Sequence, residues 1–163
     1  MKENFFQFRL NHLYCQYFTI IWFKDNDSKI ENSNLKNVFI NSLTRSFFIN
    51  LAALIDPVKN GGFKNLTIRT LKDPLDEKYG DIVSKVQTIR NKLIGHNDDD
   101  TYGNIESFLN DINLTYENTK EILDYLVSIV EEKENLTFND LKEKLKKEIY
   151  QGLENLFTRK PSN

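Results

Sequence analysis

The stretch TIRNKLIGHNDDD, residues 88–100, groups three side chains that could do chemistry together. Arg90 and Asn91 are adjacent, and His96 follows six positions after the arginine. An imidazole has an ordinary pKa of about 6.5, so His96 can accept or return a proton near neutral pH. A guanidinium presents a planar fork of N–H donors that fits a phosphate or a carboxylate. The three residues are therefore a candidate catalytic group.

A structural role explains the same residues. A basic residue and a histidine in or after the last turn of a helix complement the negative end of the helix dipole. Arg90 could also form an ion pair with a carboxylate such as Asp56 or Glu121. From the residue types alone, both interpretations stay open.

The motif lies at the end of a predicted helix over residues 73–94. The pair Asp73-Pro74 is typical of an N-cap followed by the first helical position, and Gly95 is a natural C-terminal stop. Helical spacing is shared by a set of apolar residues, namely Leu75, Tyr79, Ile82, Val86, Ile89 and Leu93. This spacing predicts one face turned toward a core.

The same helix predicts where the polar side chains of the motif lie. At about 100° per residue, measured from the middle of the apolar sector, Arg90 falls at about 40°, inside that sector, and Asn91 at about 140°. An arginine within an apolar face needs a partner or an anionic ligand, because an unpaired desolvated charge is costly. A turn at Gly95 could bring His96 back toward the helix end.

The rest of the chain predicts helices and no strand. Helices are expected over residues 4–24, 35–55, near 105–109, over 115–134 and after Thr137, whereas residues 65–73 fit either a short helix or an extended strap. These elements predict an all-α bundle of four to five long helices with short ones added. The 163 residues suit one domain, expected over 1–158, with 159–163 as a disordered tail.

The Asn-Leu-Thr tripeptides at Asn65, Asn113 and Asn135 are interpreted as helix-start chemistry rather than as a repeat. The single cysteine, Cys15, excludes an internal disulfide and a cysteine-rich zinc site, and its apolar neighbours predict a small buried hydrophobe. His12 is interpreted as packed or at a surface edge.

Charge is unevenly distributed along the chain. Residues 57–95 carry eight Lys/Arg against four Asp/Glu, whereas residues 96–134 carry two against eleven. One face could therefore meet a polyanion while the rest of the surface repels it, although solvated helix faces explain the same counts. We find no secretion signal, and the apolar run YFTIIWF is far short of the roughly 20 residues that span a bilayer, so we expect a cytoplasmic protein without a membrane segment.

Three stretches together resemble a known family. The Arg-Asn pair with a histidine after it, at the end of a helix, is similar to the signature of the HEPN superfamily, in which four to six residues separate Arg from His. The phrases NLAALIDP, residues 50–57, and KNLTIRTL, residues 64–71, resemble the abortive-infection branch of that superfamily. The resemblance covers about residues 5–135.

The resemblance implies a fold and an activity. HEPN ribonucleases cut RNA without a metal or other cofactor, in a cleft between two protomers of a homodimer. Carried over, catalysis falls on Arg90, Asn91 and His96, and we expect substrate contacts from Lys92, Asn97 and Asp98. The implied role is that of a toxin or an anti-phage abortive-infection effector, whose possible partner is an antitoxin of the nucleotidyltransferase type.

Two positions depart from the family pattern. Gly95 replaces an alanine-like residue before the histidine, and Asp98 stands where antitoxin-regulated members often have tyrosine. The alternatives are a non-catalytic HEPN module that binds a nucleotide or a protein, and a purely structural helical domain. A magnesium site at Asp98-Asp99-Asp100 is a further, weaker interpretation, because consecutive loop acids usually face water.

Overall fold

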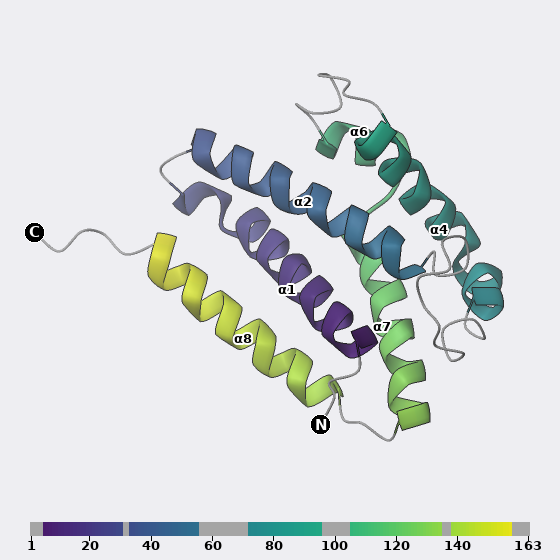
Figure 1. Cartoon of the computed structure of the whole chain (residues 1–163). Coiled ribbons are helices and arrows are strands. Elements are labelled where there is room, and N and C mark those ends of the chain that lie inside the picture. Colours follow the sequence, from purple (N-terminus) through teal and green to yellow (C-terminus); the bar gives the residue numbers. More distant parts are fainter. Residues whose placement is uncertain (1–4, 31–32, 56–71, 96–104, 135–137, 158–163) are drawn as a thin grey trace, which may run out of the picture. The chain divides into compact units, whose positions relative to one another are not determined.

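The computed structural model describes residues 5–30, 33–55, 72–95, 105–134 and 138–157, and within these ranges every regular element is helical (Figure 1). In chain order they are α1 Phe5–Asp25, the 3-10 helix η1 Asp27–Lys29, α2 Ser33–Ile55, α4 Lys72–Gly95, α6 Ile105–Asp111, α7 Tyr116–Glu134 and α8 Phe138–Phe157. The all-α prediction is confirmed, and the predicted helix limits agree with these bounds to within a few residues. Of the stretch over residues 65–73, for which a short helix or a strap was expected, residues 72 and 73 belong to α4 and residues 65–71 lie outside the described residues. The tail at 159–163 also lies outside them.

Contacts divide the chain into two compact units. Unit 1 comprises residues 1–44 and 123–163, and unit 2 comprises residues 45–122. The division falls within α2 and within α7, so each unit contains part of both helices. The expectation of one domain over residues 1–158 stays a prediction.

Unit 1 is built on the aromatic side of α1. The helix buries residues at three- and four-residue spacing, namely Leu10, Leu13, Tyr14, Tyr17, Phe18, Ile20, Trp22 and Phe23. At its end, Trp22 and Phe23 form a cluster with Ile40 of α2, against which Tyr150 and Leu153 of α8 pack. Burial of large aromatic side chains is the main stabilising contribution that such a cluster can supply.

A buried polar contact also holds unit 1 together. The Tyr14 hydroxyl on α1 donates a 2.6 Å hydrogen bond to Oδ1 of Asp124 on α7. Lys142 on α8 places its Nζ 3.0 Å from the same oxygen. Burial, followed by the hydrogen bond to Asp124, raises the pKa of Tyr14 far above its ordinary value. One carboxylate thus joins three helices of this unit.

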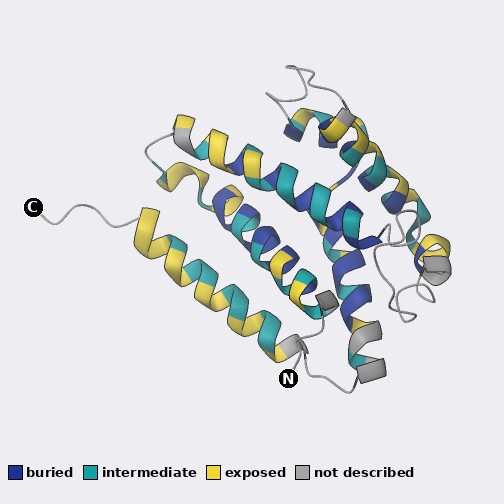
Figure 2. Ribbon diagram, in the orientation of Figure 1, coloured by how far each residue is buried: buried dark blue, intermediate teal, exposed yellow. Residues whose placement is uncertain are grey.

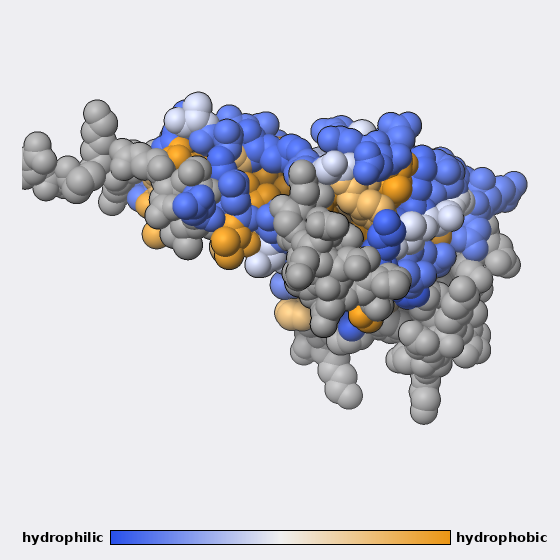
Figure 3. All heavy atoms as spheres, turned by 90° about the horizontal axis from the view of Figure 1, so that it is seen from above, coloured by the Kyte–Doolittle hydropathy of each residue, from blue (hydrophilic) through white to orange (hydrophobic). Residues whose placement is uncertain are grey.

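α8 is the most superficial helix of unit 1. It packs on α1, yet none of its described residues is fully buried (Figure 2). Its inward face is half-buried and consists of Leu141, Leu145, Ile149 and Leu153, whereas Leu156 is 75% exposed. Figure 3 shows, on one face, hydrophobic side chains that reach the surface between hydrophilic ones.

Unit 2 surrounds α4, which carries the motif. Its core combines side chains from the last part of α2, from α4, from α6 and from the start of α7, namely Phe47, Phe48, Leu51, Leu54, Val83, Val86, Ile89, Leu93, Ile105, Leu109 and Ile122. The predicted inward positions Val86, Ile89 and Leu93 of α4 are confirmed as buried, whereas Tyr79 is only half-buried. Tyr79 has φ −129° and ψ 20°, which is not helical, so α4 is kinked there. The sequence pattern did not predict this kink.

α2 has the composition of a membrane-spanning helix over Lys36–Ile55, with a mean hydropathy of 1.5. Of that stretch, 39% is buried within the protein. The core helix of a folded protein has the same composition, so the length and hydropathy of α2 are weak support for a membrane segment.

Candidate active site at the end of α4

The last turns of α4 join Arg90 to Asn91. Oδ1 of Asn91 accepts two hydrogen bonds from the guanidinium, one from Nε at 3.3 Å and one from Nη2 at 3.1 Å. Arg90 is half-buried, with its helix neighbour Ile89 fully buried, and Asn91 is exposed. The arginine therefore leaves the apolar face of α4 and presents its fork beside the amide at the surface.

This pairing was not expected from helix geometry. Adjacent residues on a helix point about 100° apart and do not face each other. The side chain of Arg90 spans that angle because an arginine has three methylenes between its Cα and its guanidinium, which gives it the reach to meet Asn91 Oδ1. Of the two carboxylate partners expected from the sequence, Glu121 is exposed, and Asp56 lies outside the described residues, so the pairing with Asp56 stays a prediction.

The two residues after Asn91 have different surroundings from each other. Lys92 is exposed and places its Nζ 4.3 Å from the centre of the Phe108 ring on α6, which is a cation–π contact. Leu93 is buried in the core of unit 2. Ile94, four residues after Arg90, is 65% exposed. A large apolar side chain thus lies at the surface beside the arginine fork.

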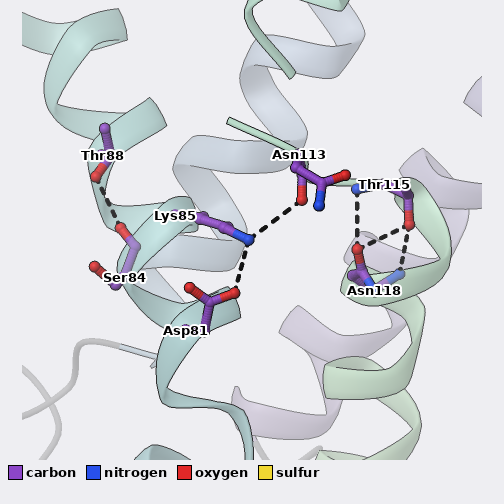
Figure 4. Close-up of polar contacts among 7 residues, drawn as sticks. All are labelled: Asp81, Ser84, Lys85, Thr88, Asn113, Thr115 and Asn118. Carbon is purple, nitrogen blue, oxygen red and sulfur yellow. Dashed lines mark hydrogen bonds and ion pairs between the residues drawn. The ribbon is translucent and has the colours of Figure 1, made fainter. Parts of the chain in front are cut away.

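α4 is also tied to the turn that follows α6. Lys85 pairs with Asp81 at 2.7 Å and donates to the backbone oxygen of Asn113 at 3.3 Å (Figure 4). On the same stretch of α4, the Thr88 hydroxyl donates to the backbone oxygen of Ser84 at 2.9 Å. Lys85, five residues before Arg90, therefore binds α4 to the turn between α6 and α7.

The turn between α6 and α7 is fixed by one Asn-Leu-Thr tripeptide. Asn113 has φ 52°, and the N–H groups of Asn113 and Leu114 donate to the carbonyls of Asn110 and Leu109, which is a Schellman ending for α6. Thr115 then caps α7, because its Oγ1 accepts from the N–H of Asn118 while Asn118 Oδ1 accepts from the N–H of Thr115 (Figure 4). The helix-start interpretation is confirmed at this tripeptide.

The other half of the predicted site lies outside the described residues. This applies to His96, Asn97 and Asp98, and to the acidic run Asp98-Asp99-Asp100. The chain leaves α4 at Gly95 and enters α6 at Ile105, which is buried. Among the described residues, no group of three His, Cys, Asp or Glu side chains is placed to hold a metal ion.

Two further residues singled out from the sequence, His12 and Cys15, belong to unit 1. His12 is exposed on α1, in agreement with a surface position. Cys15 is half-buried rather than fully buried, and burial raises the pKa of its thiol.

Comparison with known proteins places this arrangement in a family. The HEPN AbiU2 family model, described as AbiU2, matches residues 23–150. The chain belongs to the HEPN AbiU2 family. The matched range contains α4 and the whole Arg90 to His96 motif, so the resemblance to the abortive-infection branch is confirmed and the chain is an abortive-infection HEPN domain. Neither the curated proteins nor the solved structures gave a match.

Sequence reasoning missed two residues at the motif of this HEPN AbiU2 domain. Ile94 falls at about 80° on the helix, just beyond the apolar sector, and an isoleucine in that position is a signal for a surface contact. Phe108 lies sixteen residues after Lys92 in the sequence, and no local pattern relates the two. Only the packing of α6 beside α4 brings them together.

Proposed function

We propose that this HEPN domain is a metal-independent endoribonuclease that acts as a toxin or as an effector of abortive infection. The observation that carries the proposal is the guanidinium of Arg90, which leaves an apolar helix face to lie with Asn91 at the surface, in a chain of the AbiU2 family. The planar guanidinium carries a positive charge and a set of N–H donors that fit a phosphate, and Asn91 lies beside it at the surface.

The chemistry follows from the residue types. The 2′-oxygen of a ribose attacks the adjacent phosphorus, and the bond from phosphorus to the 5′-oxygen breaks. One His96 accepts the proton of the 2′-hydroxyl, and a second imidazole gives a proton to the leaving 5′-oxygen. Arg90 stabilises the charge that builds on the phosphate oxygens, and Asn91 holds the guanidinium in place. The products are a 2′,3′-cyclic phosphate and a 5′-hydroxyl.

A homodimer supplies the second imidazole. One histidine cannot readily act as base and acid at the same moment, whereas a two-fold axis brings two copies of the motif to one cleft. The exposed Ile94, on the same side of α4 as Arg90, supports such an interface, because contact with a second copy would bury it. In this arrangement Asn97 and Asp98 contact the substrate, the enzyme works in the cytoplasm, and a nucleotidyltransferase-type antitoxin is a partner able to restrain it.

The test is RNA cleavage in the absence of metal. Purified wild type, Arg90→Ala and His96→Ala are incubated with total cellular RNA in EDTA, and the fragment ends are identified. Wild type is expected to yield cyclic phosphate and 5′-hydroxyl ends. Both variants should lose at least about a hundredfold in rate, with unchanged helical content and dimer mass.

Two results would count against the nuclease. Equal cutting by wild type and both variants would trace the activity to a contaminant or to other residues. Absence of cutting by a folded wild-type dimer that still binds RNA, a nucleotide or an antitoxin would favour the non-catalytic binding module instead.

A further inference from the structure

The helix α6 is too short to be stable by itself. It has seven residues, Ile105–Asp111, and isolated helices of fewer than about twelve residues are marginal in water. Its position therefore depends on contacts with neighbouring elements. Because α6 begins where the chain returns from residues 96–104, the same contacts determine where the far end of that stretch is attached.

Contacts hold α6 on both sides within unit 2. Toward α7, the Tyr116 hydroxyl donates to Oε1 of Glu106 at 3.2 Å. Toward α4, the ammonium of Lys92 lies 4.3 Å from the centre of the half-buried Phe108 ring. The ends of the 96–104 stretch are thus attached to helices that touch each other at Lys92 and Phe108.

Lys92 lies two residues after Arg90, and its charge alone would make it a phosphate ligand. In the described part of the chain, however, its ammonium contacts the face of an aromatic ring and no carboxylate. A lysine that holds a ring in this way brings the negative face of the ring quadrupole under its charge and covers the ring with its methylenes. The contact fixes α6 against the last turns of α4.

We propose that Lys92 is a positioning residue of the nuclease, which acts through the ring of Phe108 and not by holding a substrate phosphate. By fixing α6 on α4, it sets the distance between Arg90 and the point at which the His96 stretch ends. This inference rests on the proposed ribonuclease function for its effect on catalysis, whereas the fixing of α6 is independent of any activity.

The experiment compares substitutions on the two sides of the contact in the full-length protein. Lys92→Met keeps the methylene stem and removes the charge, Phe108→Leu keeps an apolar side chain and removes the π face, and the double variant tests whether the two act through one contact. Lys92→Arg restores a cation over the ring. Lys78→Met is the matched control, because it removes the same charge from the other end of α4, where Lys78 lies over Tyr79.

The first measurement is hydrogen exchange of the α6 amides, which needs no activity. Both single variants are expected to raise exchange over residues 105–111 by about two- to fivefold, the double variant by no more than either one, and Lys92→Arg and Lys78→Met not at all. Exchange over these residues that is identical in every variant would overturn the proposal.

The second measurement is single-turnover cleavage of a short RNA that the wild type cuts, at several salt concentrations. Lys92→Met and Phe108→Leu should both lower the maximal rate, with the RNA affinity and its salt dependence unchanged, and Lys92→Arg should recover the rate. A phosphate ligand behaves differently: Lys92→Met would weaken binding and lower the salt slope by about one, and Phe108→Leu would do neither. That pattern would overturn the positioning role while leaving the nuclease intact, whereas a wild type that cuts nothing would reject the nuclease alone.

Discussion

Two polar groups of this molecule contrast in what they connect. In unit 1, Tyr14, Asp124 and Lys142 come from three helices and meet at one carboxylate oxygen. In unit 2, Arg90 and Asn91 are adjacent residues of a single helix, and their hydrogen bonds lie at the surface. The first group joins elements that are far apart in the sequence, whereas the hydrogen bonds of the second join adjacent residues of one helical turn.

The contrast separates residues that hold the fold from residues that are available for chemistry. A buried hydrogen bond to a carboxylate contributes to stability because its loss leaves a desolvated charge short of a partner. A contact between the polar ends of adjacent residues at the helix surface contributes little, since both groups can reach water without it. The guanidinium of Arg90, which lies beside an exposed amide at the surface, is suited to bind an anionic ligand.

The largest effect on RNA cleavage is expected from a substitution of Arg90. Arg90→Lys keeps the charge and loses the planar set of donors, so RNA cleavage is expected to fall about tenfold to hundredfold. The midpoint of thermal unfolding should stay within about 1 °C, because lysine keeps both the positive charge and an apolar methylene stem. Cleavage kinetics and a thermal melt on the same preparation check both statements, and a variant that melts several degrees lower would assign Arg90 to the fold.

Tyr14→Phe tests the other side of the comparison. Removal of the hydroxyl takes one hydrogen bond from Asp124, which keeps its contact with Lys142. The expected loss is about 1 to 1.5 kcal/mol, at the low end for a bond to a charged group because the carboxylate is partly exposed. For a chain of this size the melting midpoint should fall by about 2 to 5 °C. RNA cleavage at 25 °C should not change, and a loss of cleavage without a loss of stability would contradict the division of roles.

The pH dependence of stability in wild type and in Tyr14→Phe gives a further test. Burial raises the pKa of Tyr14 above its ordinary value of 10.0, and the hydrogen bond to Asp124 raises it further. Above about pH 10 the unfolded chain loses this proton while the folded chain keeps it, so the stability contributed by Tyr14 is complete below that pH and falls above it. The difference in stability between wild type and Tyr14→Phe should be constant from pH 7 to 9 and should narrow from pH 10 to 11. Denaturant unfolding across that range measures it, and a constant difference would contradict the burial of the hydroxyl.

The smallest effect is expected for Asn91→Ala. Asn91 is exposed and accepts from the adjacent Arg90, so the free energy of unfolding should change by no more than about 0.5 kcal/mol. Cleavage should nevertheless fall, because the guanidinium loses the group that fixes it. Denaturant unfolding with a cleavage assay checks the pair of outcomes, and a stability loss above about 1 kcal/mol would make Asn91 a structural residue.

Much of the fold could be predicted from the sequence because local chemistry determines it. The spacing of Val86, Ile89 and Leu93 gave the inward face of α4, and Gly95 gave its end. The Asn113-Leu114-Thr115 tripeptide marked a helix boundary because asparagine tolerates a positive φ and threonine caps the next helix. These signals act over a few residues and need no knowledge of packing.

The candidate site could be predicted only in part, because its contacts depend on packing and on long side chains. The angle between Arg90 and Asn91 on a helical wheel argues against their pairing, and a flexible side chain overcomes it. The contact between Lys92 and Phe108 requires α6 to lie beside α4, which no spacing indicates. The placements of His96, Asn97 and Asp98 remain predictions.

The kink at Tyr79 divides α4 into two helical segments. Arg90 lies in the second segment, so the direction of its side chain around the helix axis depends on the number of residues from Gly80 onward. One extra residue between Gly80 and Arg90 would rotate Arg90 by about 100° about the helix axis. An extra residue before Tyr79 would instead be accommodated by a change of backbone angles at the kink. Insertions and deletions in α4 should therefore be tolerated before Tyr79 and not between Gly80 and Arg90.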